Sequence, residues 1–265
     1  MPEGDTIWKT SRQLHAAFSG HQFTKSDLRV PAHATADLHD WWMFGVRSRG
    51  KHILMDLSPD ANDAPELVLH TTLGMEGSWR VFDAGQKWRG GPGWQIRAVM
   101  ATASHVAVGY RLPHTDLIRV EQESGIVGHL GPDLLGDNWD PALAIQRLVR
   151  SGDRPIADAL LDQRMLAGIG NVYKSELCFI ARLNPWTPVT QVANLGFLLS
   201  EAHRLLRINR HTYARVTTGD PRHPMWVYSR GGQPCRVCGT AIRVREQGET
   251  SSKRWTWWCP SCQPS

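Results

Sequence analysis

The stretch LLDQRMLAGIGNVYKSE (residues 160–176) lies between two segments whose apolar residues recur three and four positions apart, a spacing typical of helices. Gly168 and Gly170 allow a tight backbone path between the two helices. Asn171 would then be the N-cap of the second helix. The free amides at a helix start, together with an Asn side chain, suit a phosphate group. The stretch therefore predicts two helices joined by an anion-binding turn.

Around this turn the sequence predicts a helical region from residue 141 to about residue 216. Its four segments with helical periodicity are PALAIQRLVR (141–150), PIADALLDQ (155–163), NVYKSELCFIARL (171–183) and ANLGFLLSEAHRLLRI (193–208). Cys178 stands alone in an apolar stretch and is expected to be a buried structural thiol.

The first half of the chain has a different pattern. From about residue 22 to 120, apolar segments alternate with polar residues or are broken by glycines, which favours antiparallel strands. A helix is expected over 5–18, capped by Asp5 or Thr6, and SPDANDAP (58–65) has the composition of a loop. Strands followed by helices predict an α+β fold with a β domain first.

Four of the five cysteines fall in two pairs, CRVC and CPSC, with twenty residues between the pairs. Two such pairs suit tetrahedral binding of zinc by their four thiolates, Cys235, Cys238, Cys259 and Cys262. Two disulfides are the alternative, which a cytosolic setting disfavours. A hairpin this small has little core of its own, so the metal would supply much of its folding energy.

Basic charge is concentrated in the last quarter of the chain. Residues 203–265 hold eleven Lys/Arg and three acidic residues, a net charge of +8, whereas the rest holds 19 basic and 22 acidic residues, a net charge of −3. This asymmetry is typical of proteins that bind a phosphate backbone, the alternative being a solvated basic tail. No apolar run reaches the ~18 residues of a membrane span, and the start lacks the layout of a signal peptide. We therefore expect a cytoplasmic protein with no membrane partner.

The chain begins MPEGDTIWKT, and its second residue could be reactive. Removal of Met1 would expose the nitrogen of Pro2, a secondary amine. A terminal α-amine has a reference pKa near ~8, well below that of lysine, so a useful fraction is the unprotonated nucleophile at neutral pH. Taken alone, a Met-Pro start is more often unreactive.

Several features occur in one order along the chain. They are a Pro-Glu start, a hairpin lysine in SRGKHI, a Gly-Ile-Gly-Asn turn between helices, and a four-cysteine hairpin with an arginine before its third cysteine. This set resembles the formamidopyrimidine-DNA glycosylase/endonuclease VIII family of DNA repair enzymes over essentially the whole chain, most closely its actinobacterial endonuclease VIII-like branch. The resemblance implies an N-terminal catalytic β-sandwich domain (1–125), a helical domain with a helix–two-turn–helix (126–225) and a zinc-binding β-hairpin (226–265).

The resemblance also implies a reaction on damaged DNA. The Pro2 nitrogen would attack C1′ of a nucleotide and expel the base, leaving an iminium that acidifies the C2′ proton and leads to β- and δ-elimination. Glu3 matches the family's general acid/base. Lys51 would act on the base or phosphate side of the lesion, and Arg254 would grip phosphates that flank it. Asn171 corresponds to the phosphate-binding Asn of the helix–two-turn–helix.

Two further residues have open alternatives. Glu176 either helps to order the N-terminus or is a helix cap or surface residue. Met75, in HTTLGMEGSW (70–79) with Leu73 beside it, either fills the gap that a flipped nucleotide leaves in the base stack or packs in the core.

The preferred lesion is suggested by what the sequence lacks. The stretch YRLPHTDLIRV (110–120) has no Arg-Arg-Phe-Gly segment of the kind found in purine-specific members, and the connection from Arg210 to Cys235 is short. Both features favour oxidised pyrimidines such as thymine glycol or 5-hydroxycytosine, in duplex or single-stranded DNA. The alternatives are an oxidised-purine glycosylase on the same scaffold and a non-catalytic DNA-binding zinc module. We expect a monomer, associated with the nucleoid of a bacterium.

Overall fold

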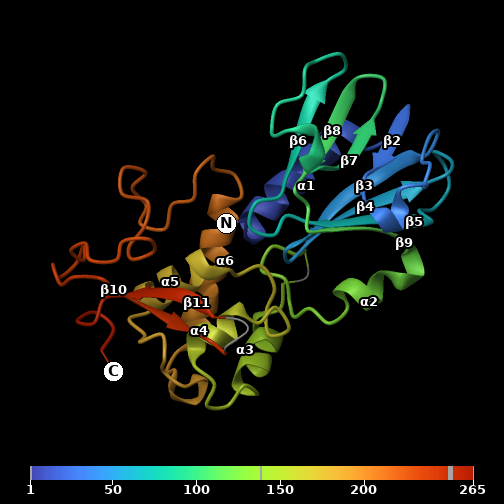
Figure 1. Ribbon diagram of the computed structural model, residues 1–265. Helices are drawn as coiled ribbons and strands as arrows, with labels where there is room; N and C mark the ends of the chain where they lie inside the picture. Colours follow the sequence, from blue (N-terminus) through green and yellow to red (C-terminus); the bar gives the residue numbers. More distant parts are fainter. Residues whose placement is uncertain (1, 138, 250–252, 265) are drawn as a thin grey trace. The chain divides into compact units, whose positions relative to one another are not determined.

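The computed structural model describes residues 2–137, 139–249 and 253–264. The chain divides into two compact units (Figure 1). Pro2 groups with Thr6–His129 in the first unit, whereas Glu3–Asp5 group with Leu130–Ser265 in the second. The division after residue 129 falls a few residues beyond the boundary expected at 125. The segment 226–265, which the sequence sets apart, lies in the same unit as the helices.

The first unit consists of a helix and two antiparallel sheets, which confirms the predicted β-sandwich. One sheet has the strand order β1-β3-β4-β5-β9 and the other β2-β7-β8-β6. The helix is α1 (Gly4–Phe18), and the strands are β1 (His21–Gln22), β2 (Lys25–Leu28), β3 (Trp42–Arg49), β4 (His52–Ser58), β5 (Leu67–Thr72), β6 (Ser78–Asp83), β7 (Ile96–Ala101), β8 (His105–Tyr110) and β9 (His114–Arg119). Short helical turns are η1 (Pro31–His33), η2 (Gly93–Gln95), η3 (Val120–Gln122) and α2 (Glu123–Val127).

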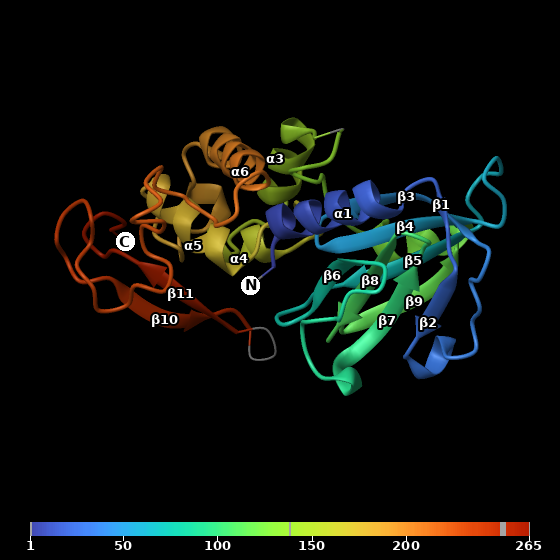
Figure 2. The same cartoon turned by 90° about the horizontal axis from the view of Figure 1, so that it is seen from above.

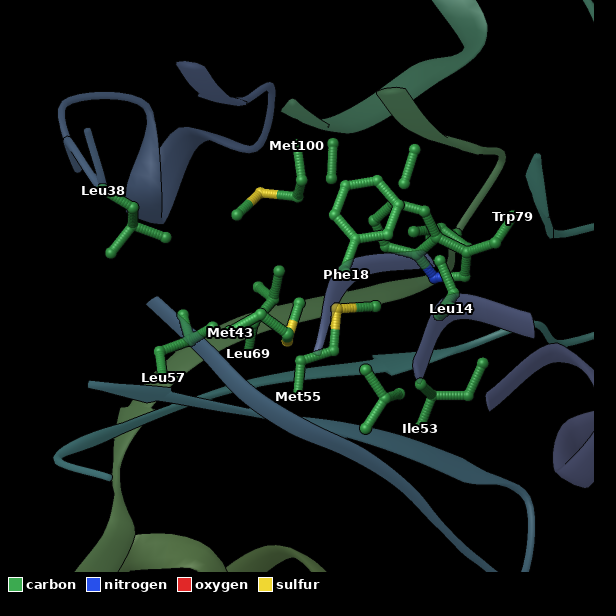
Figure 3. Close-up of a cluster of buried hydrophobic side chains, with 14 of the residues drawn as sticks. Leu14, Phe18, Leu38, Met43, Ile53, Met55, Leu57, Leu69, Trp79 and Met100 are labelled. Carbon is green, nitrogen blue, oxygen red and sulfur yellow. The ribbon is translucent and has the colours of Figure 1, made fainter. Parts of the chain in front are cut away.

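The core of this unit lies between the sheets and α1. Every second residue of β4 (Ile53, Met55 and Leu57) belongs to the buried cluster, as expected for one face of a strand. Helix α1 contributes Leu14 and Phe18, four positions apart on one helix face. Figure 3 shows these side chains converging on a common interior. Alternate residues of β4 thus face this cluster, while Leu54 is buried on the opposite face of the strand.

Helix α1 begins at Gly4, one residue earlier than expected. Asp5 and Thr6 therefore lie inside its first turn, and the prediction that one of them caps the helix is wrong. The Asp5 carboxylate instead accepts hydrogen bonds from Arg215 and Tyr173.

The second unit contains helices where the 3.6-residue period predicted them. Its elements are α3 (Pro141–Val149), α4 (Ile156–Leu161), α5 (Asn171–Ile180), η4 (Val189–Gln191), α6 (Leu195–Asn209) and the hairpin strands β10 (Arg243–Gln247) and β11 (Arg254–Trp258). Helix α5 lies centrally and packs against α4, α6 and β11 (Figures 1 and 2). All its residues from Asn171 to Phe179 are buried, including Cys178, which confirms the expected structural thiol. Within the described residues, none of the helices combines the length and apolar character that crossing a bilayer requires.

Candidate active site and metal centre

A carboxylate from the start of the chain caps helix α5. Glu3 accepts hydrogen bonds from the Gly170 N–H (2.7 Å) and the Val172 N–H (2.8 Å), with a longer contact from the Tyr173 N–H (3.4 Å). The Glu3 side chain is fully buried. Negative charge is favourable here because the first amides of a helix lack partners and the helix dipole is positive at this end. The carboxylate therefore fixes the first residues of the chain onto the glycine turn.

Glycines make this close approach sterically feasible. A Cβ on Gly170 would lie 2.5 Å from Cδ of Glu3, closer than real Cβ contacts. Gly168 has a φ of +112°, a conformation that side chains other than glycine rarely adopt. The carbonyl of Gly168 accepts a hydrogen bond from the Gly4 N–H (2.8 Å). The Gly-Ile-Gly sequence thus lets Glu3 and Gly4 pack directly against the turn before α5.

Asn171 is not the N-cap that the sequence predicts. The N-cap is Gly170, and Asn171 is the first residue of α5. The amides expected to bind a phosphate already donate to Glu3, because a carboxylate supplied by the tertiary fold has replaced the local cap. The Asn171 side chain is buried, and its Oδ1 has no hydrogen-bond partner among the described residues.

A second buried network holds the same segment. The Arg215 Nε donates to Asp5 (2.8 Å), and the Tyr173 hydroxyl donates to the same carboxylate (2.9 Å). The Arg215 guanidinium also lies 3.8 Å from Glu3 and 4.8 Å from the centre of the Tyr173 ring. Its side chain is only 12% exposed. Sequence reasoning missed Arg215, since its two acidic partners, Glu3 and Asp5, lie at the other end of the chain.

Helix α5 also holds the segment that precedes the hairpin. The fully buried Glu176 accepts hydrogen bonds from the N–H groups of Trp226, Val227 and Tyr228, each at 2.8 Å, and from the Thr217 hydroxyl. Glu176 is thus neither a surface residue nor a helix cap. Its hydrogen bonds within the described residues hold the segment 217–228 rather than the N-terminus.

A buried lysine of α5 joins the helix to the hairpin. Lys174 donates to the Thr256 hydroxyl (2.7 Å) and to the Trp255 carbonyl (3.2 Å). Burial lowers the pKa of Lys174 to about 8. Arg254, the first residue of β11, directly precedes these two positions and is exposed. The sequence signal for this contact with the hairpin is a lysine within an apolar helical segment, and sequence reasoning missed it.

The four paired cysteines meet at one end of the hairpin. Their Sγ atoms all lie within 4.8 Å of one another, with 3.4 Å between Cys238 and Cys259 and 3.9 Å between Cys235 and Cys262. Disulfide sulfurs would be ~2 Å apart, whereas sulfurs ~2.3 Å from a tetrahedral zinc are separated by about 3.8 Å. The cluster therefore fits a bound metal such as zinc, as the spacing predicted.

Pro2, Lys51 and Met75 line one cleft of about 910 Å³ within the first unit. Lys51 lies in the turn between β3 and β4, and Arg97 and Arg111 add positive charge to the lining. Met75 is 66% exposed, so the core alternative for this residue is wrong. Its neighbour Leu73 is buried in the core instead.

Both units match known families. The sequence pattern of the formamidopyrimidine-DNA glycosylase N-terminal domain matches residues 1–118, and that of the formamidopyrimidine-DNA glycosylase H2TH domain matches residues 130–208. The chain is 48% identical to the probable endonuclease 8 2 of Streptomyces coelicolor, over 99% of this chain and 94% of that protein. It is 41% identical to the DNA-(apurinic or apyrimidinic site) lyase Nei2 of Mycolicibacterium smegmatis, over 99% of both chains.

Solved structures agree on the fold. The complex of Lactococcus lactis Fpg with abasic-site DNA superposes with a TM-score of 0.81 at 20% identity, covering both chains completely. A β-sandwich with an N-terminal helix, helix–two-turn–helix elements and a four-cysteine hairpin define a DNA repair enzyme of the glycosylase/lyase class. The chain belongs to the formamidopyrimidine-DNA glycosylase (Fpg/Nei) family, with actinobacterial endonuclease 8 2 proteins among its relatives.

Replacing Arg215 tests the buried network at the chain start. In Arg215→Ala, two buried carboxylates lose their cation, so the free energy of unfolding should fall by ~3–5 kcal/mol. Arg222, paired with Asp220 and 84% exposed, provides the matched control, and Arg222→Ala should change stability little because surface pairs are weak. Urea unfolding measures both variants, and equal losses would contradict the role given to Arg215.

Proposed function

We propose that the chain is a bifunctional DNA glycosylase/AP lyase that excises oxidised pyrimidines from damaged DNA through a Schiff base on the Pro2 nitrogen. The observation that carries this proposal is the Glu3 carboxylate on helix α5. Because Pro2 is bonded to Glu3, the cap holds the terminal nitrogen within one residue of a fixed point. Such positioning is what an N-terminal nucleophile needs.

The chemistry then follows from the amine. After removal of Met1, which lies outside the described residues, the Pro2 nitrogen attacks C1′ and the base leaves with the electrons of its glycosidic bond. Lys51, on the same cleft, faces the base or phosphate side of the lesion. Glu3 serves first as a positioning residue, and its predicted proton transfer to the sugar ring would use a carboxylate lone pair that the backbone N–H groups do not occupy.

Two residues of the second unit are proposed to bind the DNA backbone. Arg254 is exposed and sits beside the Lys174 hydrogen bonds, so its planar guanidinium projects from an anchored strand. Asn171 has an unsatisfied side-chain oxygen, and a flip of its amide would turn a donor toward a phosphate. Met75, which is exposed on its turn, is proposed to fill the gap that a flipped nucleotide leaves in the base stack.

Oxidised pyrimidines are favoured over oxidised purines by the segment after α6. Its residues Trp226, Val227 and Tyr228 donate to Glu176, so this part is tied to α5 and little chain remains to cover a larger flipped base. Damaged DNA is the proposed partner, since related structures hold abasic-site DNA.

Borohydride trapping on a thymine-glycol duplex tests this proposal. An adduct that peptide mapping assigns to Pro2 is expected, with faster strand cleavage than on an 8-oxoguanine:cytosine duplex. The matched control is a protein with an N-terminal tag, in which the Pro2 nitrogen is part of an amide. This protein should bind DNA without forming an adduct. If intact-mass measurement shows that Met1 has been removed and abasic DNA still gives no adduct, the catalytic proposal is wrong and a DNA-binding module is the better account.

The metal proposed for the four-cysteine cluster is structural zinc. We expect one zinc per chain by elemental analysis, and loss of zinc together with DNA affinity in Cys238→Ser. Cys178→Ser, which changes a buried thiol of α5, should retain the metal. Full zinc content in Cys238→Ser would contradict the assignment.

A further inference from the structure

A chain of hydrogen bonds runs through the sheet beside the Pro2 cleft. His52 Nδ1 lies 2.8 Å from His70 Nε2, and His70 Nδ1 lies 3.2 Å from a carboxylate oxygen of Asp116. The three residues belong to β4, β5 and β9, which are neighbours in the first sheet, and His70 is directly opposite Asp116 in the strand register. His70 is buried, whereas His52 also lines the cleft.

This arrangement determines which ring nitrogens carry protons. A carboxylate only accepts hydrogen bonds, so His70 donates from Nδ1 and, as a neutral ring, has a bare Nε2. His52 must then donate from Nδ1, which leaves its own Nε2 without a proton. Burial, reinforced by the neighbouring His70, His129, His114 and Lys51, lowers the pKa of His52 to about 4. At neutral pH the series of hydrogen bonds therefore ends at the unprotonated Nε2 of His52, which can accept a proton.

The other charged groups near the reactive end are less suited to accept one. Lys51, Arg97 and Arg111, which line the cleft, are cations. The Glu3 carboxylate is fully buried and already accepts backbone N–H groups. Glu76 lines the cleft but is exposed on the turn that carries Met75. Of the two histidines that line the cleft, His114 is exposed, whereas His52 is partly buried and its ring is oriented by the hydrogen bond to His70.

The lyase step of the proposed function releases a proton. We propose that His52 is the base of the β-elimination, held in its accepting tautomer by the positioning residues His70 and Asp116; this inference rests on the proposed function. The C2′–H bond breaks, and the proton goes to His52 Nε2. The electron pair forms the C2′–C3′ double bond while the C3′–O bond breaks and the phosphate leaves with its electrons. Throughout the step the Nδ1–H of His52 donates to His70 Nε2, and His70 donates to Asp116, so the ring stays oriented while its Nε2 holds the proton.

The test separates Schiff-base formation from elimination in single turnovers on abasic-site duplex DNA. In His52→Gln, the yield and rate of the borohydride adduct on Pro2 should stay near those of the unmodified enzyme. Strand cleavage should slow by ~10²-fold or more, the usual contribution of a general base. Deuterium at C2′ should slow cleavage further in the variant, because proton removal becomes rate-limiting.

Two other variants complete the design. Asp116→Asn removes the negative charge that accepts the hydrogen bond from His70. The Asp116 side chain is 45% exposed, so this variant tests the relay even where His52→Gln folds poorly. It should slow strand cleavage while adduct trapping is retained. His39→Gln, a change at an exposed histidine paired with Asp40, should leave both rates unchanged.

The outcomes distinguish this inference from the function on which it rests. Unchanged cleavage in His52→Gln would overturn the inference, as would equal losses of trapping and cleavage. A slowing seen only in His114→Gln would assign the base to that exposed cleft residue instead. Failure of the unmodified enzyme to form any Pro2 adduct would overturn the proposed function itself.

Discussion

The hydrogen bonds from helix α5 to the Glu3 carboxylate are the interaction that joins the start of the chain to the second unit, and the reactivity proposed for Pro2 depends on them. They satisfy backbone amides that a helix start leaves unpaired, and they are charge-assisted, hence stronger than neutral ones. The same contact joins the first residues of the chain to a turn more than 160 positions later. Side chains are absent at the glycines of this contact because the backbones of Gly4 and Gly168 meet here and because the Glu3 side chain lies against Gly170. The start of α5 and the position of Glu3, the neighbour of Pro2, therefore depend on the same hydrogen bonds.

Helix α5 organises its surroundings through buried charges. Glu3 meets its start, Lys174 reaches the hairpin strand β11, and Glu176 holds the segment around Val227. Each charged group is fully buried and each is hydrogen-bonded, as the cost of an unpaired buried charge demands. Apolar packing alone would leave the hairpin free to slide along the helix, whereas hydrogen bonds to named atoms fix its register. We infer that the Lys174 hydrogen bonds set the position of the strand from which Arg254 is proposed to contact DNA.

Local patterns predicted much of the fold and little of the way its parts are joined. The 3.6-residue period located α3 to α6, alternation located the sandwich, and the CxxC pairs predicted a cluster that the sulfur distances support. The sequence places Asn171 at the N-cap because N-cap preference is a local property. In the structure Gly170 is the N-cap, and Glu3, distant in sequence, accepts hydrogen bonds from the start of the helix. Arg215 was missed for the same reason. The His52 relay depends on the register of three strands, which no single segment encodes.

The central claim is that the Glu3 cap fixes the distance between helix α5 and the Pro2 nitrogen. The most direct measurement is the rate of borohydride trapping on abasic-site DNA by a chain with one glycine inserted between Pro2 and Glu3. A glycine inserted in the loop 58–65 is the matched control. Displacing the nucleophile by one residue while the cap stays intact should slow adduct formation by ~10²-fold or more, with DNA affinity and melting temperature unchanged. An unaltered trapping rate would contradict the claim.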